Sequence, residues 1–179
     1  MVKEFEGGAE NSLTQIKPVL DRLETIDPET VKLKLTEEAS EKDSVAGIVI
    51  EPLPELESVS ASDGQEYEFY AARVGSGEHV NPHVHFAGEE LYRLIAGKGV
   101  MHIGTIGEDN AVVWQDDPIF VKSGETIIVK VGQVHSFEVI GEEPVIFIFS
   151  CPESHLNDDQ DRLMTTEHQN GFPEYRNSS

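Results

Sequence analysis

Cysteine is nearly absent from this sequence: Cys151 is the single one among 179 residues. A disulfide within one chain and a cysteine-based metal cluster are therefore excluded, and any metal site must use histidine and carboxylate side chains. Cys151 follows the apolar run 144–150. We expect it to be a buried thiol at the end of a core strand, where it acts as a small hydrophobic group.

Basic residues are also scarce, with 13 Lys and Arg against 34 Asp and Glu, which gives a net charge of −21. Such a surface repels the phosphate groups of DNA and RNA. We therefore expect no nucleic-acid partner. The acidic excess extends over the whole sequence, which is typical of a solubilising surface.

Long apolar runs are missing too. No segment approaches the roughly 18 apolar residues that a membrane-spanning helix needs. Residues 1–8 contain no apolar run of the kind found in a secretory signal. The sequence thus predicts a cytoplasmic protein with no membrane partner.

Residues 1–44 are expected to form a helical, acidic N-terminal extension. From Asn11 to Thr25, apolar residues recur every three or four positions, and Asn11 or Ser12 is placed to cap an amphipathic helix. A second helix could begin at Asp27, because Pro28 is favourable at a first helical position. The Glu- and Lys-rich stretch that continues to residue 43 is interpreted as an exposed helix or linker.

Residues 45–152 have the composition of a small all-β domain, since short segments rich in β-branched and aromatic residues alternate with glycine-containing turns. The expected strands are 45–50, 67–74, 80–85, 90–96, 100–106, 111–115, 118–121, 126–131, 135–140 and 145–150. Many short strands of this kind indicate a sandwich or a barrel such as a jelly roll. Residues 153–179 are expected to be a polar C-terminal tail, in which Leu156 and Leu163–Met164 could dock a short helix on the barrel or on a neighbouring subunit.

Three histidines and one glutamate form a candidate metal site. His83 and His85 flank one residue, so on a strand both side chains point to the same face. Glu90 begins the next apolar segment, and pairing of that strand beside the first would bring its carboxylate to the histidines. His135 begins a later strand. Three imidazoles and one carboxylate suit divalent transition metals and commonly leave open positions for substrate or water.

The spacing of these residues resembles the two motifs of the cupin superfamily. Gly77, His83, His85, Glu90 and Gly97 match every fixed position of the first motif. The second motif is matched by Gly124, Gly132 and His135, but Lys130 replaces a usual proline and Val139 a usual asparagine. The resemblance covers roughly residues 65–150.

This resemblance implies a double-stranded β-helix, or jelly-roll barrel, with one divalent metal ion at its mouth. The ion, which could be Fe, Mn, Ni or Zn, would be held by the residues matching His83, His85, Glu90 and His135. Glu89 is adjacent to Glu90 and would face the other side of the strand, so one residue of register decides between them. Only Glu90 also has the motif's distance to Gly97.

Two further residues are pocket candidates. Tyr92 faces the same side as Glu90, where its phenol could hydrogen-bond a ligand or donate a proton, or simply pack in the barrel. The position of His102 depends on a hairpin turn at 97–99. A three-residue loop places His102 opposite Leu94 on the pocket face, whereas a two-residue loop places Met101 there.

The remaining histidines, His79, His155 and His168, lie in polar or irregular segments and are expected at the surface. Arg73 and Arg93 are candidates to bind an anionic substrate. Arg93 neighbours Tyr92 and should therefore point away from the metal, while the sequence leaves the facing of Arg73 open.

The favoured function is a metal-dependent enzyme acting on a small organic metabolite, with a dioxygenase-type reaction preferred because such an ion has sites for O2 and substrate. A sugar or sugar-phosphate isomerase is the alternative. Residues 90–92 and 97–99 are similar to those of cupin-type phosphosugar isomerases, but 129–132 lack their Pro-Pro-aromatic stretch. A non-catalytic, metal-stabilised ligand-binding or sensor protein is the third possibility. Open strand edges and the apolar stripe of the first helix predict a homodimer.

Overall fold

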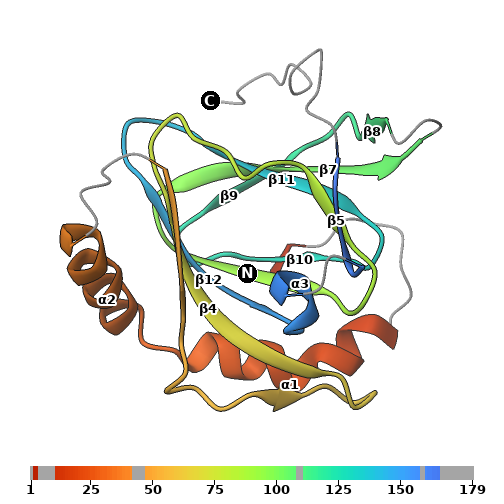
Figure 1. The fold of residues 1–179 in the computed structure, drawn as a ribbon, viewed down its shortest axis with the longest axis horizontal. Coiled ribbons are helices and arrows are strands. Elements are labelled where there is room, and N and C mark those ends of the chain that lie inside the picture. The colour runs from red at the N-terminus through yellow and green to blue at the C-terminus, as the bar shows by residue number, and fades with distance from the viewer. Residues whose placement is uncertain (1, 4–10, 42–46, 108–110, 158–159, 166–179) are drawn as a thin grey trace.

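The computed structural model describes residues 2–3, 11–41, 47–107, 111–157 and 160–165. Within them, two β-sheets face each other, and the two N-terminal helices cover one outer side (Figure 1). The first sheet has the strand order β1 (Val2–Lys3), β10 (Thr126–Val129), β6 (Glu90–Ala96), β12 (Val145–Cys151), β4 (Glu66–Val74) and β2 (Ile48–Pro52), with β3 (Val59–Ser60) also on β4. The second has the order β13 (Arg162–Met164), β5 (His83–His85), β11 (Val134–Val139), β7 (Lys98–Ile106) and β8 (Val112–Trp114), with β9 (Ile119–Lys122) also on β7. The pairings are antiparallel except β1 with β10. The all-β, jelly-roll prediction is confirmed.

Side-chain alternation divides the core into two parts. On β4, Tyr70 and Ala72 point between the sheets, whereas Phe69 and Ala71 point outward toward the helices. The period of two along a strand explains why one strand supplies both cores. Cys151 ends β12 as a fully buried residue of the inter-sheet core, as expected.

The first helix, α1 (Asn11–Thr25), has the predicted bounds, and its buried Ile16, Val19 and Leu23 pack on the outer face of the first sheet. Its apolar stripe is thus covered by the protein's own barrel, which removes one reason for expecting a dimer. The homodimer itself stays a prediction. No helix in the described segments is both long and apolar enough to cross a bilayer.

The second helix, α2 (Pro28–Glu41), begins where Pro28 indicated. Asp27 caps it by accepting hydrogen bonds from the hydroxyl of Thr30 at 2.8 Å and from the backbone N–H of Glu29 at 3.3 Å. The interpretation of this stretch as an exposed segment was wrong in part. Val31 and Leu35 are buried in the outer core, so α2 also covers the barrel.

Neither arginine candidate lines the central cavity described below. Arg93 points to the helices, as predicted, and its guanidinium donates hydrogen bonds of 2.9 Å to the carbonyls of Leu23 and Ile26 at the end of α1. A cation at this end of a helix also interacts favourably with the helix dipole. Arg73 is two residues after Ala71 on β4, so its side chain is on the same, helix-facing side of the strand.

The segment around Gly97 carries the chain from one sheet to the other. β6 belongs to the first sheet and β7 to the second, so the expected hairpin between them does not form. Gly97 has φ of 78°, and a Cβ there would lie 2.7 Å from the carbonyl oxygen of Pro144. Both the left-handed backbone and the close approach require glycine. The predicted turn at 107–110 lies mostly outside the described residues.

The C-terminal region contributes to the barrel as well. α3 (Ser154–Asn157) packs Leu156 against the inter-sheet core, and β13 pairs with β5. The expectation of a short helix was right for Leu156 but wrong for Leu163 and Met164, which are in a strand. Strands β1, β3 and β13 are so short that their sequences carry no clear alternation.

Candidate metal centre

His83, His85, Glu90 and His135 converge inside the barrel, and all four side chains are buried. Their potential ligand atoms lie within 4.8 Å of one another. His83 and His135 are directly opposed on the paired strands β5 and β11, and His85 shares the face of His83. The structure therefore brings together the four residues that the sequence singled out.

The carboxylate reaches the histidines by a different route from the one expected. β6 does not pair with β5 but lies in the opposite sheet, between β10 and β12. Glu90 therefore projects across the barrel toward the three imidazoles. Its neighbour Glu89 faces away and contacts the hydroxyl of Tyr67 at 3.1 Å, so the register places Glu90 in the cluster.

Backbone carbonyls orient two of the imidazoles. Nδ1 of His83 lies 2.7 Å from the carbonyl oxygen of Asn81, and Nδ1 of His135 lies 3.2 Å from that of Gln133. In the tautomer with its N–H at Nδ1, each ring donates to its carbonyl, and Nε2 is the inward nitrogen. Histidines that ligate metals are commonly held in this way.

The charges inside the cluster favour a bound cation. Burial lowers the pKa of His83 to about 3 and that of His85 to about 4, so both imidazoles are neutral at neutral pH. Burial alone would raise the pKa of Glu90. Its close contact with His135, whose Nε2 lies 2.9 Å from Oε2 of Glu90, and the nearby histidines outweigh the burial and hold that pKa below its usual range. The cluster thus offers the neutral imidazoles of His83 and His85 and one anionic oxygen from Glu90.

This donor set fits a divalent transition metal, since imidazole and carboxylate suit Fe(II), Mn(II), Ni(II) and Zn(II) alike. The two facing sheets, the jelly-roll topology and the cluster at the motif positions together decide the fold type. The protein has a jelly-roll barrel fold, which is the fold that the resemblance to the cupin motifs implied. Its four motif residues sit where the resemblance implied, on the inner face of the barrel.

Tyr92 lies beside the cluster, on the face of the strand that it was expected to share with Glu90, and it also packs in the inter-sheet core. Its hydroxyl is 3.3 Å from Nε2 of His135, and the side chain lines the central cavity. Burial and the charge of Glu90 raise the pKa of Tyr92 well above its usual value. The phenol therefore keeps its proton and acts as a hydrogen-bond donor.

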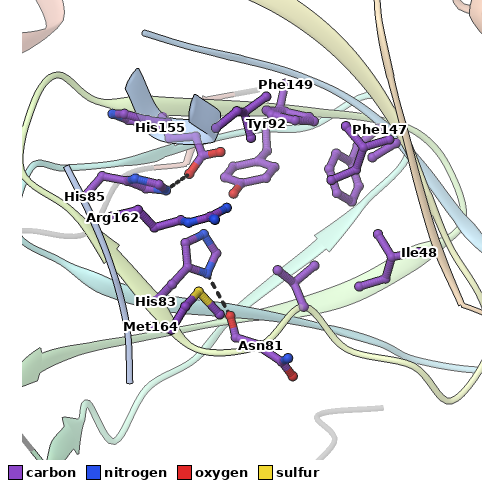
Figure 2. A pocket seen from close by; sticks show the side chains of 15 residues that line it. Ile48, Asn81, His83, His85, Tyr92, Phe147, Phe149, His155, Arg162 and Met164 are labelled. Atoms are coloured by element: carbon purple, nitrogen blue, oxygen red, sulfur yellow. Dashed lines mark hydrogen bonds and ion pairs between the residues drawn. The ribbon is translucent and has the colours of Figure 1, made fainter. Parts of the chain in front are cut away.

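The cluster opens into a cavity of about 210 Å³ (Figure 2). Its wall is mostly apolar. The apolar lining residues are Ile48, Ile50, Ala72, Val80, Phe147, Phe149, Leu156 and Met164. The polar lining residues are His83, His85 and Glu90 of the cluster together with Asn81, Tyr92, His155 and Arg162. A cavity of this size and lining suits a small organic molecule.

The prediction for His155 was wrong. This histidine is fully buried and stacks on His85, with ring centroids 3.8 Å apart and planes at 3°. Its Nε2 contacts the carbonyl oxygen of Ala87 and lies 3.6 Å from Asp161. Helix α3 folds back to the barrel and buries it, which its polar sequence neighbourhood concealed. His79 is exposed as expected, and His168 lies outside the described residues.

His102 does not line the cavity, so the alternative that made it a pocket residue was wrong. Met101 takes the inner side and belongs to the inter-sheet core, while His102 lies on the outer face of the second sheet. This is the facing that the two-residue loop predicted, although the hairpin on which both alternatives depended is absent. Nε2 of His102 lies 2.9 Å from Glu138, and the ring meets Trp114 edge-on.

Arg162 and Met164 are pocket residues that sequence reasoning missed. They belong to β13, which pairs with β5 across a long sequence separation. The alternation Arg-Leu-Met was the only available signal, and three residues are too few to indicate a strand.

Comparison with known proteins finds similar structures at low identity. No protein-family model and no curated protein matches the sequence. Among solved structures, the chain is similar to oxalate decarboxylase from Bacillus subtilis, with 18% identity and a TM-score of 0.45 over 65% of this chain and 27% of the other. It is similar to an oxalate oxidase with 19% identity and a TM-score of 0.44, over 60% of this chain and 51% of the oxidase. It is also similar to the protein TT1209 from Thermus thermophilus with 14% identity and a TM-score of 0.44, over 59% of this chain and 84% of TT1209.

The match thus spans about a quarter of the decarboxylase and half of the oxidase. Likeness at this level concerns the fold and carries nothing about the reaction.

Proposed function

We propose that this chain is a cupin and a metal-dependent enzyme acting on a small organic molecule, with a dioxygenase-type reaction as the favoured one. One observation carries the proposal: a buried cluster of three imidazoles and one carboxylate contributes His83, His85 and Glu90 to the wall of a small, mostly apolar cavity. A metal ion held only for stability needs no such cavity beside it. The cavity gives a substrate access to the ion's open positions.

The residues around the cavity would have separate roles in such a reaction. His83, His85, Glu90 and His135 would hold the ion, and a redox-active one such as Fe(II) would supply positions for O2 and substrate. The backbone carbonyls that fix His83 and His135 keep their nitrogens aimed inward. Tyr92 would donate its proton in a hydrogen bond to an oxygen atom of the bound substrate, and the apolar wall would exclude water from it.

A sugar or sugar-phosphate isomerase is the second candidate function. Recognition of several hydroxyl groups needs several polar partners, because an unpaired buried polar group is costly. Beyond the cluster, the described lining offers only Asn81, Tyr92, His155 and Arg162. The apolar share of the wall therefore favours a substrate with fewer hydroxyl groups.

The test begins with metal analysis of protein purified without added metal, followed by loading with Fe(II) under argon. We expect one ion per chain, and O2 consumption when a small-molecule cell extract is added. The variant His83→Ala with Glu90→Ala should lose the ion, whereas Glu89→Ala should keep it.

Retention of one ion per chain by the double variant would contradict the site. A Zn(II) or Mn(II) form that converts a sugar without O2 would replace the dioxygenase proposal with the isomerase. A stoichiometric ion without any turnover would favour a ligand-binding or sensor protein.

A further inference from the structure

Strand β13 places a cationic side chain beside the metal cluster. Arg162 is directly opposite His85 in the antiparallel pair with β5, and Met164 is opposite His83. Directly opposed residues of such a pair share one face of the sheet. Figure 2 accordingly shows Arg162 extending between His83 and His85 toward Tyr92.

Within the part of the chain that the structure describes, no hydrogen bond or ion pair joins the guanidinium of Arg162 to another residue. It is also the one Lys or Arg among the described residues lining the cavity. An arginine side chain carries a fixed fork of N–H donors that matches a carboxylate in two parallel bonds. The cavity therefore contains a ready binding group for one anion.

The wall away from β13 is apolar. Ile48 and Phe147 lie on the far side of the cavity from the strand that carries Arg162 (Figure 2). Cavities of about 150 Å³ hold one benzene molecule, so about 210 Å³ accommodates on the order of eight non-hydrogen atoms. A molecule that fills this space has one charged end and a short apolar body.

We infer that the cavity binds small monocarboxylates with an apolar body, and that Arg162 holds the carboxylate group. This inference rests on the proposed function, because it names the substrate class of the same site. A second acidic group on the ligand would find no second Lys or Arg in the described lining. Arg162 is thus the residue that selects the substrate class.

Isovalerate and its uncharged, nearly isosteric amide, isovaleramide, are the probes for the test. Isothermal titration at pH 7.5 would measure their binding to the full chain, both metal-free and Zn(II)-loaded. We expect isovalerate to bind the unmodified protein more tightly than the amide. The variant Arg162→Met should lose about 10- to 100-fold in isovalerate affinity, the worth of hydrogen bonds to a charged group.

Three controls separate the outcomes. Lys98→Met removes an exposed charge away from this cavity and should leave isovalerate affinity unchanged. Arg162→Lys keeps the charge without the fork and should fall between the unmodified protein and Arg162→Met. Circular dichroism and metal analysis should give the same fold and ion content for every variant.

Two results would overturn the inference: no isovalerate binding to the unmodified protein, or equal affinity for isovalerate in Arg162→Met. If the ion is present in either case, the proposed metal enzyme stands. If the protein binds no ion but isovalerate binding still depends on Arg162, the proposed function fails and the monocarboxylate site stands.

Discussion

Acidifying the metal-free protein from pH 7.5 to pH 5.0 should lower its free energy of unfolding by about 4 kcal/mol, chiefly through two histidines. Burial holds the pKa of His83 at about 3 and that of His85 at about 4, against 6.5 for an ordinary imidazole. Over this pH interval the unfolded chain takes up protons at both positions and the folded chain does not.

Acidification therefore lowers the free energy of unfolding, because the unfolded chain binds more protons than the folded one. Protonation at pH 5.0 stabilises an unfolded imidazole of pKa 6.5 by about 2 kcal/mol, and the folded one gains almost nothing. Two such groups give about 4 kcal/mol in favour of unfolding. Glu90 acts later, because its lowered pKa stabilises the folded state above pH 4.5 and that contribution is lost only as the pH falls further.

Urea unfolding at 25 °C, followed by circular dichroism at both pH values, measures the effect. The variant His83→Asn with His85→Asn should lose most of the pH dependence. A smaller dependence should remain because burial also lowers the pKa of His102. A change below about 1 kcal/mol in the unmodified protein, or an undiminished change in the variant, would refute the reasoning.

Three further predictions concern single positions. Arg93→Met removes two charge-assisted hydrogen bonds to the end of α1 and should lower the free energy of unfolding by about 3 kcal/mol in urea titrations. As a control, Arg22→Met on α1 itself should change that free energy by less than about 1 kcal/mol. Glu90→Gln should weaken Zn(II) binding by at least about 10-fold in competition with a chelator dye, whereas Glu89→Gln should leave it unchanged. Gly97→Ala should lower the melting temperature by about 5 °C or more in scanning calorimetry, and an unchanged value would contradict the strain assigned to this position.

Local spacing together with the resemblance to the cupin motifs was enough to name the residues of the candidate site, although not the strand pairing that brings Glu90 to it. His83 and His85 share a face because of their spacing alone, and Glu90 was preferred to Glu89 by its distance to Gly97. The bounds of α1 followed from its apolar periodicity and capping residues in the same way. Each of these predictions needed only neighbours a few residues away.

The errors concern contacts between distant segments. The facing of His102 was argued from a hairpin that does not exist, because the chain changes sheets at Gly97. His155 and Arg162 look like surface residues in their polar surroundings, yet α3 and β13 bring them to β5. Strand pairing over such separations depends on the packing of the entire barrel, and local composition does not encode it.

The division of the metal cluster between the two sheets gives the inter-sheet core a second role. His83, His85 and His135 are carried by one sheet and Glu90 by the other. The thickness of the core between them therefore acts as a spacer that sets the distance from the carboxylate to the nitrogens. Exchanging a large aromatic such as Phe147 for a smaller residue would alter the distance between the carboxylate and the imidazoles without changing any of the four side chains, so the geometry that the cluster offers to an ion would be adjustable from the hydrophobic interior.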